Sequence, residues 1–292
     1  QIFKFLKKPG KIVSLSWNSS QFDRNVCRST FWRNLEKPYL MNTNGNAEAD
    51  LLHIARAAHL YFPGSIKTGT TSKNNPEFKL TSISKANDLK HEIKHSAESD
   101  CEATLLTAKL IKKKTPTLWE SAFMTTNKSS VINLLDKELM CFTTENYGGS
   151  PKGHLVTFLV QHPVYQYPLC FDLRHDVEPF LNISIEALRD EIKKRPKPIR
   201  TIKHSAHPIL MNSNFLKNIE PYNKIGMETL LERAKKIKKN KNLSEKLAIL
   251  KKEEIEEKNQ SNQLDKYVEE TIYNGSFPNA KDNINLDKFN EA

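Results

Sequence analysis

A change in hydrophobic patterning at Pro116 most constrains how this 292-residue chain can fold. Ahead of it, a short apolar run at 11–16 is followed by segments whose apolar residues recur every three or four positions, the spacing of helices packed on one face. Beyond a helix-like stretch at 117–137, alternating or continuous apolar runs take over, as is typical of strands. We therefore expect a domain of strand and helices, followed by a mixed α+β domain that contains a small barrel or sheet.

The first part of the chain predicts a buried strand and four helices. The strand at 11–16 lies between turn-forming residues, Pro9-Gly10 before it and Asn18-Ser19-Ser20 after it. Helices are expected at 22–36, 48–60, 78–87 and 96–113, with polar loops at 41–48 and 65–77. The last of these helices is the clearest, because a stripe recurs along it at intervals of four or three: Ala97, Cys101, Thr104, Ala108 and Ile111.

The second part predicts paired strands and charged helices. Strands at 154–162 and 167–173 are joined by the turn Pro163-Val164-Tyr165-Gln166, and 199–202 is a further short strand. Residues 183–192 form an amphipathic pattern, in which Ser184 is suited to cap the helix N-terminus. Blocks of lysine and glutamate at 226–257 predict helix with a solvated face, and residues 258–292 are typical of loop and linker.

Composition narrows the class of protein without deciding it. A net charge of +11 suits a polyanionic partner such as nucleic acid, although lysine-rich chains are often merely soluble. No apolar run approaches the roughly 18 residues of a membrane span, so no membrane association is expected. The four cysteines form no C-x-x-C pair, which favours reduced thiols in a cytoplasmic protein. The chain begins with Gln rather than Met, and we expect it to be a fragment.

Two polar segments carry the candidate chemistry. Asp23 closes the segment that follows the first strand, and His95 and Asp100 flank the start of the 96–113 helix. Carboxylate oxygens are the ligands that Mg²⁺ prefers, and an imidazole near such a site can deprotonate an attacking water. Plainer interpretations remain open, with Asp23 as a helix N-cap, His95 as a surface residue and Asp100 as a solvated acid.

The same segments resemble bacterial exonuclease I, in the subtype of the DEDD exonuclease superfamily that has a catalytic histidine. Phe78–Asn87, His95–Asp100 and Ala103–Ile111 resemble the third motif block of that family. Asn18–Asp23, with Arg28 and the helix that follows, is similar to the second block. The resemblance covers the whole chain and is most specific in the first third. It thins in the second domain, where Phe142 to Gly149 departs from the family.

The resemblance implies a fold, an activity and partners. It predicts a ribonuclease-H-like α/β exonuclease domain at 1–115, an α+β domain with an SH3-like barrel at 116–268, and the start of a helical C-terminal domain at 269–292. The implied activity is that of a 3′→5′ exodeoxyribonuclease, which degrades single-stranded DNA to nucleoside 5′-phosphates by two-metal hydrolysis in DNA repair and recombination. The implied protein is a cytoplasmic monomer that binds single-stranded DNA and associates with single-stranded-DNA-binding protein.

Roles carry over to the positions that match. The resemblance implies that His95 is the general base, which deprotonates a metal-bound water, and that Asp23 and Asp100 are Mg²⁺ ligands. It also implies that the DNA is contacted by four further residues: Arg28, Tyr39, Arg56 and Lys79. From the residues alone, Tyr39 is equally well a packed core residue, and the arginines are equally well surface charges.

Three departures from the family leave two other interpretations open. The Asp-x-Glu motif expected on the first strand has no counterpart, so two of the four acidic ligands are missing, and the helical domain stops at Ala292. Lys79 stands where the family has arginine, and lysine cannot form the two-pronged phosphate contact. The chain could instead be a catalytically inactive remnant that retains at most single-stranded DNA binding. A basic nucleic-acid-binding protein without enzymatic ancestry is the third possibility.

Overall fold

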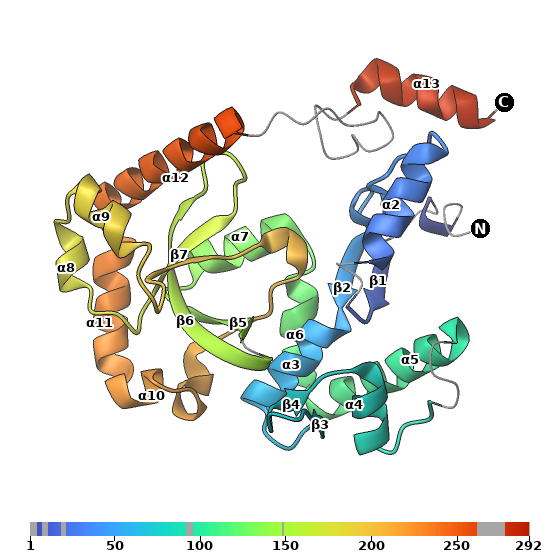
Figure 1. Ribbon diagram of the computed structural model, residues 1–292, viewed down its shortest axis with the longest axis horizontal. Coiled ribbons are helices and arrows are strands. Elements are labelled where there is room, and N and C mark those ends of the chain that lie inside the picture. The colour runs from blue at the N-terminus through green and yellow to red at the C-terminus, as the bar shows by residue number, and fades with distance from the viewer. Residues whose placement is uncertain are drawn as a thin grey trace. The chain divides into compact units, whose positions relative to one another are not determined.

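The computed structural model describes residues 5–7, 11–18, 22–91, 96–147, 149–261 and 278–291. The chain forms two compact units (Figure 1). The first unit combines Gln1–Asp50 with Asn262–Ala292, and the second is Leu51–Ser261. Each unit has its own secondary structure, so the two are described in turn. His95 lies outside the described residues.

The first unit is built on two parallel strands joined by a helix. Strand β1 (Val13–Ser16) pairs with β2 (Ala47–Asp50), and helix α2 (Asp23–Arg33) and the short helix η1 (Leu40–Asn42) lie in the connection. The strand at 11–16 and the helix at 22–36 are thus confirmed. The prediction that helix begins at 48 is wrong, because residues 47–50 are fully buried and held extended by β1.

The C-terminal end of the chain also belongs to the first unit. Helix α13 (Ala280–Glu291) corrects the expectation of loop and linker in this region. The helix is tied back by Lys37, whose Nζ lies 2.9 Å from Asp287 Oδ2, and by Asn290, whose side-chain amide donates to the Leu35 carbonyl. These contacts join residues distant in sequence, which local patterning does not reveal.

The second unit begins with a helical layer. It contains α3 (Leu51–Tyr61), α4 (Leu80–Ala86), α5 (Ala97–Lys114), α6 (Pro116–Met124) and α7 (Lys128–Lys137), with a small hairpin of β3 (Gly69–Thr70) and β4 (Pro76–Glu77). The predicted 117–137 helix is two helices, because the Asn127 side chain accepts a hydrogen bond from Ser130 N and starts a new one. The stripe predicted on α5 is partly wrong. Cys101 is exposed, and the buried face runs through Ala103, Thr107, Ala108 and Ile111.

The core of the second unit is a curved, antiparallel, five-stranded sheet (Figure 1). Its strands are β5 (Cys141–Tyr147), β6 (Ser150–Gln161), β7 (Pro168–Asp172), β8 (Ile199–Thr201) and β9 (Leu210–Met211), in the order β8-β7-β6-β5-β9. This order confirms the strands predicted within 154–173 and at 199–202. Helix α7 packs on the sheet and buries Val131 and Leu135 against Cys141, Val156 and Cys170. The edge strands β8 and β9 do not pair with each other in the described residues, so the sheet is open.

Further helices complete the second unit: α8 (Glu178–Leu181), α9 (Ile185–Glu191), η2 (His204–Ala206), η3 (Ser213–Asn218), α10 (Tyr222–Ile225), α11 (Met227–Lys238) and α12 (Lys241–Ser261). The predicted cap is confirmed, since Ser184 Oγ accepts from Ala187 N at 3.2 Å. The charged 226–257 segment divides at Asn240, whose side chain accepts from Leu243 N and begins α12. None of the helices in the described part of the chain has the length and apolar character to span a bilayer.

Candidate functional site

The predicted site residues fall into separate groups. Asp23, Arg28 and Tyr39 belong to the first unit, whereas Arg56, Lys79 and Asp100 belong to the second. The convergence of Asp23 and Asp100 with His95 on one metal ion therefore stays a prediction. Each group has a local geometry of its own.

In the first unit, Asp23 opens helix α2 with an exposed carboxylate. The residue at the cap position is Phe22, and no side chain caps this end of the helix, so the N-cap interpretation of Asp23 is wrong. Burial raises the pKa of the neighbouring Cys27 thiol, and the carboxylates of Asp23 and Glu48 raise it further. Asp23 and Glu48 therefore both lie close enough to act on the Cys27 thiol.

Glu48 is a buried carboxylate that the sequence did not single out. It is 5% exposed, and its Oε1 accepts a hydrogen bond from Arg24 Nε at 3.0 Å, while Arg28 Nη2 lies 3.7 Å from Oε2. The arginines offset the cost of burying its charge. The sequence hid this role, because Ala47-Glu-Ala-Asp50 has the composition of a helix start rather than of a strand.

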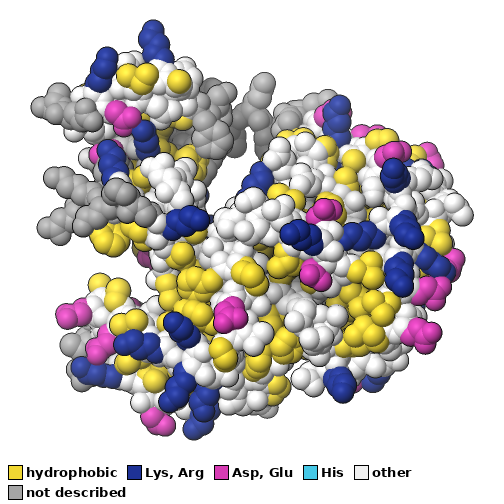
Figure 2. Space-filling model, turned by 180° about the vertical axis from the view of Figure 1, so that it is seen from behind, with side chains coloured by type: hydrophobic (Ala, Val, Ile, Leu, Met, Phe, Trp, Pro, Cys, Tyr) yellow, Lys and Arg dark blue, Asp and Glu magenta, His cyan; other side chains and the backbone are white. Residues whose placement is uncertain are grey.

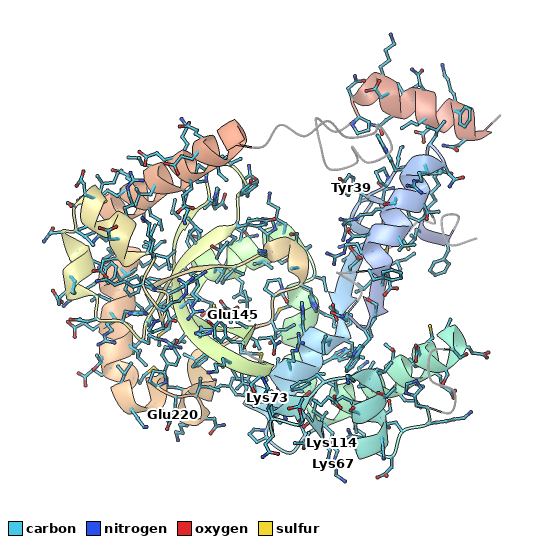
Figure 3. All side chains as sticks on the ribbon, in the orientation of Figure 1. Tyr39, Lys67, Lys73, Lys114, Glu145 and Glu220 are labelled. Atoms are coloured by element: carbon cyan, nitrogen blue, oxygen red, sulfur yellow. The ribbon has the colours of Figure 1, made fainter. Side chains whose placement is uncertain are left out.

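Arg28 and Tyr39, both predicted to contact DNA, lie against each other. The Arg28 guanidinium carbon is 5.0 Å from the centre of the Tyr39 ring, and Arg28 Nη2 donates to Asn42 Oδ1 at 2.6 Å. Tyr39 lies beside α2 and is partly exposed, so it is not a core residue (Figure 3). The Arg28 side chain is 15% exposed and also faces Glu48, so only part of the guanidinium remains for a ligand.

In the second unit, Asp100 lies in the first turn of α5 and is paired with a histidine. His91 Nε2 lies 2.8 Å from Asp100 Oδ1, and the His91 side chain is only 5% exposed while that of Asp100 is 42% exposed. His91 was not among the predicted site residues, since nothing in its spacing distinguishes it from a loop histidine. The pair holds one carboxylate oxygen in place and leaves the rest of the group accessible.

Asp23 and Asp100 suit a hard divalent cation in their chemistry. Both present carboxylate oxygens at the first turn of a helix and both are accessible, which fits the oxygen ligands that Mg²⁺ prefers. Within the residues that the structure describes, no three histidine, cysteine or acidic side chains are grouped closely enough to hold a metal.

Arg56 and the segment that carries Lys79 meet at Phe78. The Arg56 guanidinium carbon lies 5.9 Å from the centre of the Phe78 ring, and His59 contacts the same ring edge-on. Lys79, which starts α4, extends into solvent with 74% of its side chain exposed and pairs with Glu77 at 3.0 Å. Arg56 therefore contacts the Phe78 ring, whereas Lys79, the next residue in the chain, points away into solvent beside Glu77.

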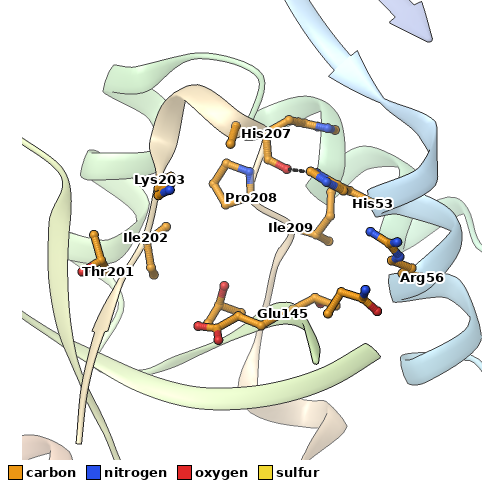
Figure 4. Close-up of a pocket in the computed structure, with 13 residues that line it drawn as sticks. His53, Arg56, Glu145, Thr201, Ile202, Lys203, His207, Pro208 and Ile209 are labelled. Atoms are coloured by element: carbon orange, nitrogen blue, oxygen red, sulfur yellow. Dashed lines mark hydrogen bonds between the residues drawn. The ribbon is translucent and has the colours of Figure 1, made fainter. Parts of the chain in front are cut away.

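Arg56 also lines a cavity of about 220 Å³ in the second unit. His53 and Arg56 project from α3 toward it, and β5 and the 201–209 segment form the other walls (Figure 4). The wall is held together where His53 Nδ1 meets the His207 carbonyl at 3.2 Å. Arg56 and Lys203 supply positive charge, while Thr143 and Thr144 add hydroxyl groups. This combination suits a phosphate-bearing ligand.

Glu145 is the acidic residue among those that line this cavity, and Arg200 offsets its charge. Its Oε2 accepts from Arg200 Nη1 at 2.8 Å, and Arg200 Nε donates in turn to Asp172 at 3.1 Å. Burial alone would raise the pKa of Asp172, but hydrogen bonds from His154 and Tyr222 and the charge of Arg174 lower it to about 2. The buried ionic network therefore leaves Arg56 and Lys203 to set the charge of the cavity.

Surface charge by itself does not mark the site. The face shown in Figure 2 carries lysine and arginine side chains interspersed with aspartate and glutamate, rather than one continuous basic patch. On this face the charge pattern singles out no site, and the cavity is distinguished by its shape and lining.

Comparisons with known proteins place these features in a family context. Residues 126–250 match the exonuclease I SH3-like domain. The chain is 30% identical to exodeoxyribonuclease I of Haemophilus influenzae and 28% identical to that of Escherichia coli, in each case over 92% of this chain. It spans 59% of the length of both relatives.

Solved structures of exonuclease I are similar in fold to this chain. The crystal structure of E. coli exonuclease I with a dA16 oligonucleotide matches all of this chain and 64% of its own, with a TM-score of 0.79 and 25% identity. An ExoI/SSB-Ct complex matches with a TM-score of 0.76 and 24% identity, over all of this chain and 63% of its own. These likenesses confirm the predicted fold class, an exonuclease-type α/β region followed by an SH3-like region.

Proposed function

This chain is a homologue of the bacterial exodeoxyribonucleases I, and on that premise we propose that it is a 3′→5′ exodeoxyribonuclease that degrades single-stranded DNA to nucleoside 5′-phosphates. One observation carries the proposal. The likeness to the exonuclease I structure solved with an oligonucleotide extends over the whole chain, so it includes the helix starts that present Asp23 and Asp100. We also propose that the protein acts in DNA repair and recombination and that it is located in the cytoplasm.

The proposed chemistry assigns a proton transfer to this chain. His95 accepts the proton of the attacking water, while Asp100 and Asp23 bind Mg²⁺. The divalent ions, when bound, would stabilise negative charge on the phosphoryl group and on the leaving 3′-oxygen. His91 donates to Asp100 Oδ1 and so fixes the orientation of that carboxylate.

The remaining predicted contacts hold the DNA strand. Arg28 over the partly exposed Tyr39 ring pairs a cation with an aromatic group, which suits a phosphate beside an unpaired base. Phe78 is buried, so its contact with Arg56 serves to position the guanidinium for a phosphate. Lys79 offers a single exposed ammonium group in place of a guanidinium fork. Such contacts grip the backbone without reading its sequence.

Domain limits and partners complete the proposal. We place the exonuclease domain at 1–115, the SH3-like domain at 116–268 and the start of a helical domain at 269–292, and the family match at 126–250 supports the second of these. We propose that the protein acts as a monomer and associates with single-stranded-DNA-binding protein. The likeness to an ExoI/SSB-Ct complex supports that association.

A digestion assay with variants tests the proposal. Single-stranded DNA labelled at its 5′ end, incubated with the chain and Mg²⁺, should shorten stepwise from the 3′ end. His95→Gln should lower the rate by about 100-fold or more, the usual contribution of a general base. Cys101→Ser is the matched control, because Cys101 is an exposed neighbour of Asp100 and should leave the rate unchanged.

The outcomes separate the open interpretations. Cleavage that persists at the full rate in both His95→Gln and Asp100→Asn would refute the assigned roles. Binding of single strands without any cleavage by the parent chain would support the inactive remnant instead.

A further inference from the structure

Four aromatic rings line up beside the β6–β7 turn of the second unit. His162 and Tyr165 have ring centres 5.0 Å apart, Tyr165 and Tyr167 5.9 Å apart, and Tyr167 and His204 4.9 Å apart. We call these four residues the Tyr165 array. His204 comes from η2, on a separate segment that contacts α7. The sequence pattern predicts a turn at 163–166, which carries Tyr165, and a strand that begins at Tyr167, and it indicates no role for either tyrosine.

The array is half open to solvent, which is not what a packing role requires. Tyr165 is 51% exposed, whereas His162 and His204, the two ends of the array, are each 7% exposed. Large aromatic side chains normally bury most of their surface when they serve only to stabilise a fold. The array thus presents Tyr165 as a ring that contacts two neighbouring rings and still leaves about half of its surface to solvent.

The turn that carries Tyr165 is held rigid by its own hydrogen bonds. His162 N donates to the Tyr167 carbonyl, and Gln166 N donates to the His162 carbonyl, both at 2.8 Å. His162 Nδ1 accepts from Val164 N at 3.2 Å and from Tyr165 N at 3.3 Å. Because these contacts order the backbone before any ligand arrives, a stacking ligand loses little affinity to the ordering of the turn.

Positive charge accompanies the rings. Lys128 Nζ lies 2.6 Å from Gln166 Oε1 in the turn, and the Lys128 charge also acts on the imidazole of His204. Burial is the larger cause that lowers the pKa of His204, so its ring is neutral at pH 7. Lys203 precedes His204 in the chain and lines the cavity that contains Arg56. In the part of the chain that the structure describes, neither lysine forms a salt bridge.

We propose that Tyr165 and Tyr167 form a stacking platform for unpaired nucleobases, with Lys128 placed to contact the adjoining phosphates of a single strand. Every base has a face that can stack on a ring, so such a platform binds without sequence preference. Lys203 lines the cavity and directly precedes His204 of the array in the chain, so a strand held at the cavity would extend toward the rings. The proposal rests on the proposed function for its ligand, a single DNA strand, and adds to it a binding site that uses neither His95 nor the metal ligands.

A binding experiment tests the platform directly. Fluorescence anisotropy of a labelled oligothymidylate would be measured with the full chain in EDTA, so that no cleavage occurs. Tyr165→Ala should weaken binding about tenfold, the usual loss for one stacked base. Tyr165→Phe should bind as the parent chain does, because the ring is kept, and Tyr165→Leu should be weakened like the alanine variant.

Two controls make the result specific to stacking. Tyr147→Ala removes a tyrosine that is 67% exposed at the end of β5 and belongs to no ring pair among the described residues, so its affinity should be unchanged. An abasic oligonucleotide keeps the phosphates and lacks the bases, so the parent chain and Tyr165→Ala should bind it equally. Circular dichroism would show that Tyr165→Ala is folded.

Each outcome is decisive. If Tyr165→Ala binds oligothymidylate as tightly as the parent chain does, the platform is refuted and the proposed exonuclease function is untouched. If Tyr165→Ala also loses affinity for the abasic strand, the residue acts through folding or charge, and stacking is refuted. If the parent chain binds no single strand in EDTA, the platform is refuted, while the proposed function is judged separately by digestion with Mg²⁺.

Discussion

The Asp172 carboxylate should make the stability of the second unit depend on pH in the acid range. It is fully buried, and it contacts Arg174, Arg200 and His154 as well as the Tyr222 hydroxyl, which donates to it at 2.6 Å. The ordinary pKa of 3.8 applies in the unfolded chain, against about 2 in the folded one, and this difference corresponds to about 2 kcal/mol. Because the folded pKa is the lower one, this stabilisation is present above pH 4 and is lost as the pH falls toward 2.

The perturbation that isolates this contribution is Asp172→Asn. Urea unfolding followed by circular dichroism, at a series of pH values between 7 and 2, gives the free energy of unfolding of the parent chain and the variant. At pH 7 the variant should be less stable by about 3–5 kcal/mol, because Arg174 and Arg200 then lie buried or half-buried beside a neutral group. Asp190→Asn, which alters a side chain that is 79% exposed, should cost less than about 0.5 kcal/mol.

The decisive comparison is between the two curves against pH. The difference in stability between the parent chain and Asp172→Asn should shrink by about 2 kcal/mol between pH 4 and pH 2, since Asp172 becomes protonated and neutral in the parent chain. Parallel curves across that range would refute the reasoning, because they would mean that Asp172 has the same pKa in the folded and unfolded chain. Other carboxylates titrate in both proteins and cancel in the difference.

Three further variants test the site and the core. Arg56→Ala should weaken binding of single-stranded DNA about tenfold in anisotropy titrations, and equal affinity would remove Arg56 from the phosphate contacts. His91→Ala should lower the cleavage rate about 10- to 100-fold and raise the Mg²⁺ concentration needed for half-maximal rate, whereas an unchanged Mg²⁺ titration would leave His91 no role in positioning Asp100. Phe142→Ala removes a fully buried ring of β5 and should cost about 3–5 kcal/mol in urea unfolding, and a loss below about 1 kcal/mol would mean that the sheet is not packed as described.

Helices and strands that form through contacts between residues near each other in sequence could be predicted, and those held by residues distant in sequence could not. The helix capped by Ser184 and the β6–β7 hairpin depend on residues a few positions apart, and both were predicted correctly. Strand β2 was mistaken for a helix start, because its extended state comes from pairing with Val13–Ser16, far earlier in the chain. Likewise α13 was read as loop, since its contacts run to Lys37 and Leu35.

The candidate site divides in the same way. The helix starts that present Asp23 and Asp100 follow from local patterning, and they were predicted. Partners such as Glu48 beneath the arginines and His91 beside Asp100 were not, because each lies on an element or loop whose approach is fixed only by the fold. Buried charged residues are the hardest to predict, since a paired buried charge has no sequence pattern that distinguishes it from a solvated one.

The charge of the cavity shows how such hidden pairs control a candidate function. Lys203, Arg56 and Glu145 line the same space, and counting charges from sequence would give it a weak net charge. The fold shifts that balance, because Arg200 lies between Glu145 and the buried Asp172 and binds both. A neutral Asp172 would leave Arg200 with only Glu145 as its acidic partner. The buried guanidinium would then be less well compensated, and the folded sheet would be less stable. The charge of the cavity therefore depends on a carboxylate that no ligand can reach: Asp172→Asn removes a negative charge behind Arg200, so it should strengthen phosphate binding in the cavity while it lowers stability.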